Sequence, residues 1–117
     1  METPSLDLVR GTLDLLILKT LTWGPQHGYA IASAIQQCTE GALLVEEGAL
    51  YPALYRMEAK GWIEPEWGLS NSNRRAKYYS LTSEGRRRLR SEEKTWNAYT
   101  TAVAKLLSAT RLQTDRA

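Results

Sequence analysis

The fold is indicated first by one stretch of the chain, residues 47–63, with the sequence EGALYPALYRMEAKGWI. Leu50, Leu54 and Met57 are spaced four and three residues apart, which places them on one face of a helix. Gly61 follows at the point where a glycine commonly ends a helix. The stretch therefore predicts a short helix that buries one apolar face.

Pro52 limits where this helix can start. A proline removes one backbone hydrogen bond and costs a helix interior about 3 kcal/mol, so we expect the regular part of the helix to begin near Gly48 or later. Polar and aromatic side chains cover the remaining faces: Tyr51, Tyr55, Arg56, Glu58 and Lys60.

A hairpin is predicted directly after this helix. Residues 62–67 and 76–81 have the character of two strands, and residues 68–75 form a polar loop between them. Pro65 has no N–H for a strand ladder, so it belongs at an edge or non-bonded position. A short helix followed at once by a basic hairpin is typical of a winged helix-turn-helix. We expect the helix over residues 47–60 to enter the major groove of DNA.

The charge of the chain is unevenly distributed. The formal net charge is only +2, but residues 1–55 carry a net charge of −4 and residues 56–94 a net charge of +4. A basic stripe on one part of a small domain is typical of phosphate contact. Four arginines near the start of the last predicted helix either reach flanking phosphates or form a solvated face, and the sequence leaves both open: Arg86, Arg87, Arg88 and Arg90.

Composition excludes several classes of protein. The 117 residues suit one domain with one modest core, and no apolar run approaches the roughly 20 residues of a membrane span. The start of the chain lacks the pattern of a secretory signal, so a cytoplasmic protein with no membrane partner is expected. One cysteine excludes an internal disulfide, and one histidine with one cysteine gives no ligand spacing for zinc. No cofactor is predicted.

Two helices are predicted before the stretch at residues 47–63. Residues 6–21 are apolar around most of the helix, with Ser5 as its cap, which implies burial against both the domain core and a partner subunit. A second helix is expected from His27 to about Cys38. Residues 42–46 are expected to form a single short strand that pairs with the hairpin.

A long helix closes the domain, starting after Thr82 or Ser83 as its N-cap and ending near residue 108. Its apolar residues recur at a spacing of seven, and little of the domain remains for them to pack against, so a partner helix is the expected acceptor. We therefore predict a winged helix-turn-helix domain over residues 5–81, a C-terminal dimerisation helix over residues 82–108 and a flexible tail over residues 109–117.

Five motifs together resemble the PadR family of transcriptional regulators, in its compact branch with a single C-terminal helix. The motifs are GTLDLLIL at residues 11–18, HGY at 27–29, EGALYPALYRME at 47–58, GWI at 61–63 and RRAKYYSLTSEG at 74–85. The resemblance covers roughly residues 8–108, and the combination of the third motif with the fifth is highly specific.

The resemblance implies a mainly α-helical fold with a small β-hairpin, and a homodimer that acts as a repressor on a pseudo-palindromic operator in double-stranded DNA. The predicted contacts of the recognition helix are Glu47, Gly48, Tyr51, Pro52, Tyr55 and Arg56, and those of the wing are Asn73, Arg74, Arg75, Lys77 and Tyr79. The predicted dimer residues are Leu13, Leu16, Leu89, Trp96, Tyr99, Val103 and Leu106.

A small aromatic effector is a further partner that the resemblance implies. In multidrug-responsive members of the compact branch, a tryptophan of the dimer helix stacks on planar aromatic ligands, and Trp96 occupies the matching position. Trp96 as a plain residue of the dimer core is an equal alternative.

A different class of function stays open beside DNA binding. A winged helix can also serve as a module that binds protein, but such modules usually lack a basic wing, and this chain has Arg74, Arg75 and Lys77. An enzyme is not expected, because the sequence offers no nucleophile with a partner histidine, no phosphate-binding glycine loop and no paired carboxylates at a recognisable spacing.

Overall fold

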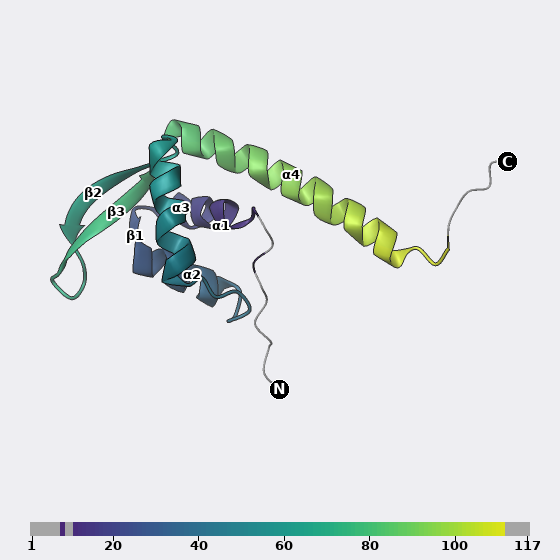
Figure 1. Ribbon diagram of the computed structural model, residues 1–117, viewed down its shortest axis with the longest axis horizontal. Coiled ribbons are helices and arrows are strands. Elements are labelled where there is room, and N and C mark those ends of the chain that lie inside the picture. The colour runs from purple at the N-terminus through teal and green to yellow at the C-terminus, as the bar shows by residue number, and fades with distance from the viewer. Residues whose placement is uncertain (1–7, 9–10, 112–117) are drawn as a thin grey trace.

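The computed structural model describes residue 8 and residues 11–111 of the chain. Four helices and a three-stranded antiparallel sheet form a winged helix, and the last helix extends far from the rest (Figure 1). The elements in chain order are α1 (Leu13–Thr20), a 3₁₀ turn (Leu21–Trp23), β1 (Gln26–His27), α2 (Gly28–Cys38), α3 (Glu47–Ala59), β2 (Ile63–Leu69), β3 (Arg75–Leu81) and α4 (Ser83–Ser108).

The core is shared by α1, α2, α3 and the inner face of the sheet. Leu50, Leu54 and Met57 are fully buried, which confirms the predicted inner face of α3. The helix begins at Glu47, so Pro52 lies within it, beyond the first turn in which a proline is readily accommodated. The other large side chains that are fully buried are Ile17, Leu18, Ile31 and Ile63.

The hairpin has β2 at one edge of the sheet, because β3 lies between β2 and β1. Pro65 therefore lies on an edge strand, as its missing N–H requires. The tip is closed by hydrogen bonds from Ser70 N to Arg74 O (2.8 Å) and from Asn73 N to Ser70 O (2.9 Å). Asn73 has a positive φ of 62°, a backbone conformation that asparagine tolerates better than most residues.

The third strand is not where the sequence predicted it. Gln26–His27 pairs with β3 through Tyr79 and Tyr78, whereas residues 42–46 contain no strand of that sheet. A strand of two residues has no periodicity, so no sequence pattern could indicate it.

The first helix is also shorter than predicted. It begins at Leu13 after Thr12, and Gly11 has a positive φ of 87°, which interrupts any helix that would run from residue 6. The predicted cap Ser5 lies outside the described residues. So does most of the predicted tail, since only residues 109–111 of it are described, and they are not helical.

A tight joint connects the sheet to α4. Thr82 caps the helix by accepting a hydrogen bond from Gly85 N (3.0 Å), and its hydroxyl lies 3.0 Å from Trp62 O, to which it donates. Leu89, predicted to belong to a dimer seam, is only 8% exposed and packs in the core of its own domain. Beyond it, α4 passes the start of α1 and then extends away from the domain (Figure 1).

Two classes of feature are absent from the part of the chain that the structure describes. None of its helices is both long enough and apolar enough to span a lipid bilayer. Nor do its histidine, cysteine and acidic residues gather in groups of three or more that could ligate a metal ion.

Candidate nucleic-acid interface

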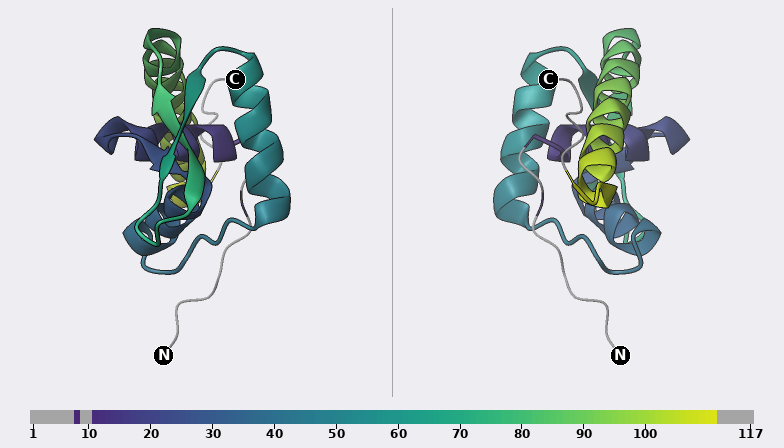
Figure 2. Two further views of the ribbon diagram at one scale, coloured as in Figure 1. Left: turned by 90° about the vertical axis from the view of Figure 1, so that its left-hand side faces the viewer. Right: turned by 90° about the vertical axis from the view of Figure 1, so that its right-hand side faces the viewer.

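The outer face of α3 is clear of the other elements (Figure 2). Tyr55 is 66% exposed and Tyr51 39% exposed. Glu47, Gly48 and Pro52 are exposed near the N-terminal end of the helix. A tyrosine hydroxyl on an exposed helix can donate a hydrogen bond to a phosphate or a base edge, and a carboxylate can accept one from a base amino group.

The wing presents the cations. Arg74 and Arg75 are exposed where the loop enters β3, next to Asn73 at the tip. The guanidinium carbon of Arg75 lies 4.6 Å from the ring centroid of Trp67, which stands on the neighbouring strand β2. This stacking holds one of the two arginines while it leaves its charge at the surface.

A hollow of about 780 Å³ lies between α3 and the wing. It brings together residues of the predicted helix and wing contacts, Tyr51, Tyr55, Arg74, Arg75, Lys77 and Tyr79. We call the side chains around this hollow the recognition face. Three large ring side chains that the sequence analysis did not assign to DNA also line it: His27, Tyr29 and Trp67.

His27 and Tyr29 enter the recognition face because α2 starts there. The Nδ1 atom of His27 accepts a hydrogen bond from Ala30 N (3.2 Å) and caps α2, and the imidazole packs edge-on against Tyr78 at 5.3 Å. Tyr29 is the most exposed tyrosine among the described residues. The HGY motif indicated a helix start, but nothing in it indicated that the start would face the wing.

Lys77 of the wing contacts two side chains of α3. Its Nζ atom lies 3.2 Å from the buried Oε1 of Glu58 and 5.3 Å from the ring of Tyr55. The carboxylate of Glu58 beside it raises the pKa of Lys77 above its ordinary value, so the ammonium stays charged. The pair ties the wing to the helix.

Tyr79, predicted among the wing contacts, belongs to the core. It is only 4% exposed, and burial raises the pKa of its phenol. Alternation along β3 places successive residues on opposite faces of the sheet, and Tyr79 falls on the inner one. Tyr79 therefore lines the hollow from the core side, and we do not count it among the exposed side chains of the recognition face.

Arg56 is likewise engaged inside the domain. Its guanidinium forms an ion pair with Asp14 of α1, a residue 42 positions earlier in the chain. The side chain of Arg56 remains 47% exposed, so the pair leaves part of the guanidinium at the surface. No local pattern could have indicated a partner so distant in the sequence.

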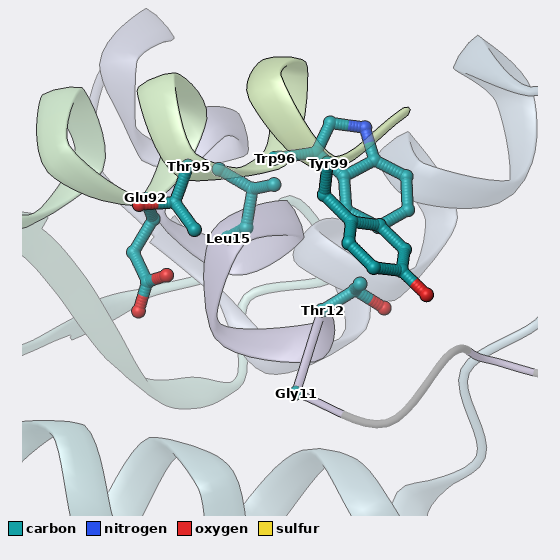
Figure 3. A pocket seen from close by; sticks show the side chains of 7 residues that line it. All are labelled: Gly11, Thr12, Leu15, Glu92, Thr95, Trp96 and Tyr99. Atoms are coloured by element: carbon teal, nitrogen blue, oxygen red, sulfur yellow. The ribbon is translucent and has the colours of Figure 1, made fainter. Parts of the chain in front are cut away.

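A second hollow, of about 300 Å³, lies between the start of α1 and α4. Figure 3 shows Trp96 and Tyr99 of α4 on the same side as Leu15 of α1 and Thr12, which precedes that helix. The centroids of the two rings are 6.4 Å apart. Glu92 and Thr95 complete the α4 side. Leu13 and Leu16 are half-buried against the domain core.

The outer half of α4, residues 96–108, carries apolar side chains that nothing in the described chain covers. Tyr99 is 60% exposed, Leu106 76% and Leu107 78%. Val103 is half-exposed on the same helix. The sequence predicted a partner helix for Trp96, Tyr99, Val103 and Leu106 of this half, and for Leu89 before it.

Comparison with known proteins identifies the family. The model of the transcriptional regulator PadR-like family matches residues 17–91. A transcriptional regulator from Clostridium thermocellum is 30% identical, with a TM-score of 0.75, and the match covers 82% of this chain and 93% of that one. A PadR family transcriptional regulator from Eggerthella lenta is 36% identical, with a TM-score of 0.72 and 86% of each chain covered.

A curated relative with no described function, protein X of Lysinibacillus sphaericus, is 33% identical over 90 residues, which is 77% of this chain and 83% of the relative. The family match runs from within α1 to the first turns of α4. It thus includes α3, the wing and the joint that connects the sheet to α4. The chain belongs to the PadR-like family of DNA-binding transcriptional regulators.

Proposed function

We propose that this protein represses transcription by binding a specific operator with α3 in the major groove and the wing against the DNA backbone. One observation carries the proposal: the exposed rings of Tyr51 and Tyr55 and the exposed guanidinium groups of Arg74 and Arg75 border one hollow. In such an arrangement the helix contacts base edges, and the arginines neutralise phosphates without discriminating sequence.

We further infer that the protein acts as a homodimer through α4 and the start of α1. Burying a large apolar side chain contributes about 1.5–3 kcal/mol, and the outer half of α4 exposes several of them. Two copies related by a two-fold axis would place their α3 helices in successive major grooves, and the operator would then be pseudo-palindromic. In this proposal residues 5–81 bind DNA and residues 82–108 dimerise.

The hollow between α1 and α4 is where we place a small planar aromatic effector. Trp96 and Tyr99 offer two rings inclined by 34°, and the hollow is open in the single chain. An effector can release the operator only if it binds one arrangement of the two domains more tightly than the other. Trp96 as part of the dimer core, with no effector, is the competing proposal.

The test is the fluorescence anisotropy of a labelled DNA fragment taken from upstream of the protein's own gene, measured at several salt concentrations beside a scrambled fragment. Affinity for the upstream fragment that exceeds the scrambled control by about 10³-fold or more would support operator recognition. Equal affinities with a steep salt dependence would contradict the proposal for that fragment and leave a basic surface. No binding at low salt would favour the protein-binding module.

A further inference from the structure

Gly28, the first residue of α2, lies in unusually close contact with the recognition helix. A methyl group at its Cα would be 2.8 Å from both Cε1 and the hydroxyl oxygen of Tyr51, and 3.0 Å from Cζ. These distances are well inside ordinary contact, so the Tyr51 ring occupies the space that any other side chain at position 28 would need.

Glycine is required at this position for space and not for backbone conformation. The φ of Gly28 lies outside the left-handed region, and the residue is helical. An alanine would therefore suit the backbone, and alanine is the better helix former. The conflict falls on the far end of one flexible side chain, which can move without the backbone.

Tyr51 has open space into which it could move. Tyr51 borders the hollow of the recognition face and also a third hollow, of about 560 Å³, between α2 and the segment leading into α3. Contact with Gly28 therefore limits the positions that the ring can adopt. The nearby tyrosine of α3 is held differently, because the ring of Tyr55 lies beneath the ammonium of Lys77.

We propose that Gly28 is a positioning residue that fixes the Tyr51 ring for base recognition. The inference rests on the proposed DNA-binding function and assigns within it the residue that sets the orientation of one contact. Phosphate contacts from the wing do not depend on this ring, so its displacement should reduce sequence discrimination and leave general affinity for DNA intact.

The experiment compares the full-length wild type with Gly28→Ala, Tyr51→Ala and the double variant, using the upstream fragment and the scrambled fragment as probes. Gly28→Ala is expected to lower affinity for the upstream fragment by about tenfold or more, with unchanged affinity and salt slope on the scrambled one. In the Tyr51→Ala background the same change should have no further effect, since the two residues act as one unit. Gln37→Ala, an exposed change at the far end of α2, is the control.

A second measurement reports on the ring itself without DNA. In protein with isotopically labelled tyrosine, the ring resonances of Tyr51 should shift in Gly28→Ala and stay unchanged in Gln37→Ala. Unchanged Tyr51 resonances in Gly28→Ala would overturn the inference. It would also be overturned if the wild type prefers the upstream fragment and Gly28→Ala keeps that preference. A wild type with no preference would instead overturn the proposed function on that fragment, and with it the recognition role of Gly28.

The double variant tests the inference even if Gly28→Ala cannot fold. If Gly28→Ala does not fold, removal of the Tyr51 ring should restore a cooperative thermal transition. A double variant that remains unfolded would mean that position 28 serves some other contact, and the inference would be rejected.

Discussion

The winged part of the chain and the outer half of α4 differ in how far their apolar side chains are buried. In the winged part, aliphatic residues from α1, α2, α3 and β2 pack against one another. The large side chains left exposed are mainly aromatic, and Trp23, Tyr55 and Trp67 among them lie beside cations. In the outer half of α4, leucines lie on the surface next to Lys105, the one charged residue of that half. The first region has a complete core in a single chain, whereas the second has none within the described chain and would gain one in the dimer that we propose. The two regions should therefore respond to mutation in different ways.

The joint between the two regions should give the largest effect. A methyl group on Gly85 would overlap Trp62 O, a backbone atom, and would lie 3.0 Å from Leu81 Cδ2. We expect Gly85→Ala to destabilise the fold by about 3 kcal/mol, which corresponds to a fall in melting temperature of roughly 12–20 °C. Calorimetry measures both quantities. Gly48→Ala is the stability control, because a methyl group there meets open space and should be neutral or slightly stabilising.

A melting temperature of Gly85→Ala equal to that of the wild type would mean that α4 is not held to the domain at this joint. The distinction between an anchored start and an unsupported outer half of the helix would then lose its basis.

The dimer should depend on the outer half of α4. We expect Trp96→Asp to weaken self-association about 100-fold, because a buried charge without a partner is costly at an apolar contact. Sedimentation equilibrium measures the change, and Leu106→Asp should act in the same direction without touching the hollow beside α1. Ala98→Asp places the same charge about 200° around the helix from Trp96 and is the matched control.

If the double-sized species persists in Trp96→Asp and Leu106→Asp alike, the exposed leucines do not form the dimer contact. A circular dichroism spectrum equal to that of the wild type establishes that each variant is folded before the result is interpreted.

The difference between the two regions also explains what the sequence could predict. The apolar spacing of α3 and the hairpin after it identified the winged helix, because both signals lie within a few residues of each other. Leu89 was assigned to a dimer seam because spacing alone does not reveal which partner fills a heptad position, and the domain core proved to reach that far along α4.

The details of the recognition face depended on contacts between distant segments. Packing between distant segments, which no local pattern encodes, determines three of these details. They are the pairing of Arg56 with Asp14, the burial of Tyr79 and the position of His27 beside the wing. The two-residue strand β1 is a further case, since it exists only because β3 lies beside it.

The wing should show a smaller effect, confined to DNA binding. We expect Arg74→Ala with Arg75→Ala to weaken binding to all sequences, on the order of tenfold, and to make the salt slope shallower by about 0.9 for each phosphate that is no longer neutralised. Arg74→Ala alone is the cleaner test, because Arg75 also stacks on Trp67. Lys94→Ala with Lys105→Ala removes the same charge from exposed positions of α4. A salt slope unchanged by the arginine substitutions would remove the wing from the proposed interface.

The smallest effect is expected at the ion pair that ties the wing to α3. The pKa of Lys77 is raised in the folded protein, chiefly by the Glu58 carboxylate beside it, so the folded state holds that proton more tightly than the unfolded state. The pair's contribution is therefore fully present below the ordinary lysine value of 10.5 and is lost as pH rises through the higher, folded value.

Glu58→Gln should lower stability by less than about 1 kcal/mol near pH 8, since both side chains are still a quarter to a third exposed. The difference from the wild type should shrink as pH rises above about 10.5, which denaturant unfolding at a series of pH values measures. Glu93→Gln, at an exposed site on α4, is the control. A difference that stays constant through the alkaline range would show that the charge of Lys77 is not what Glu58 stabilises. The buried oxygen of Glu58 would then serve only to pack the wing against α3.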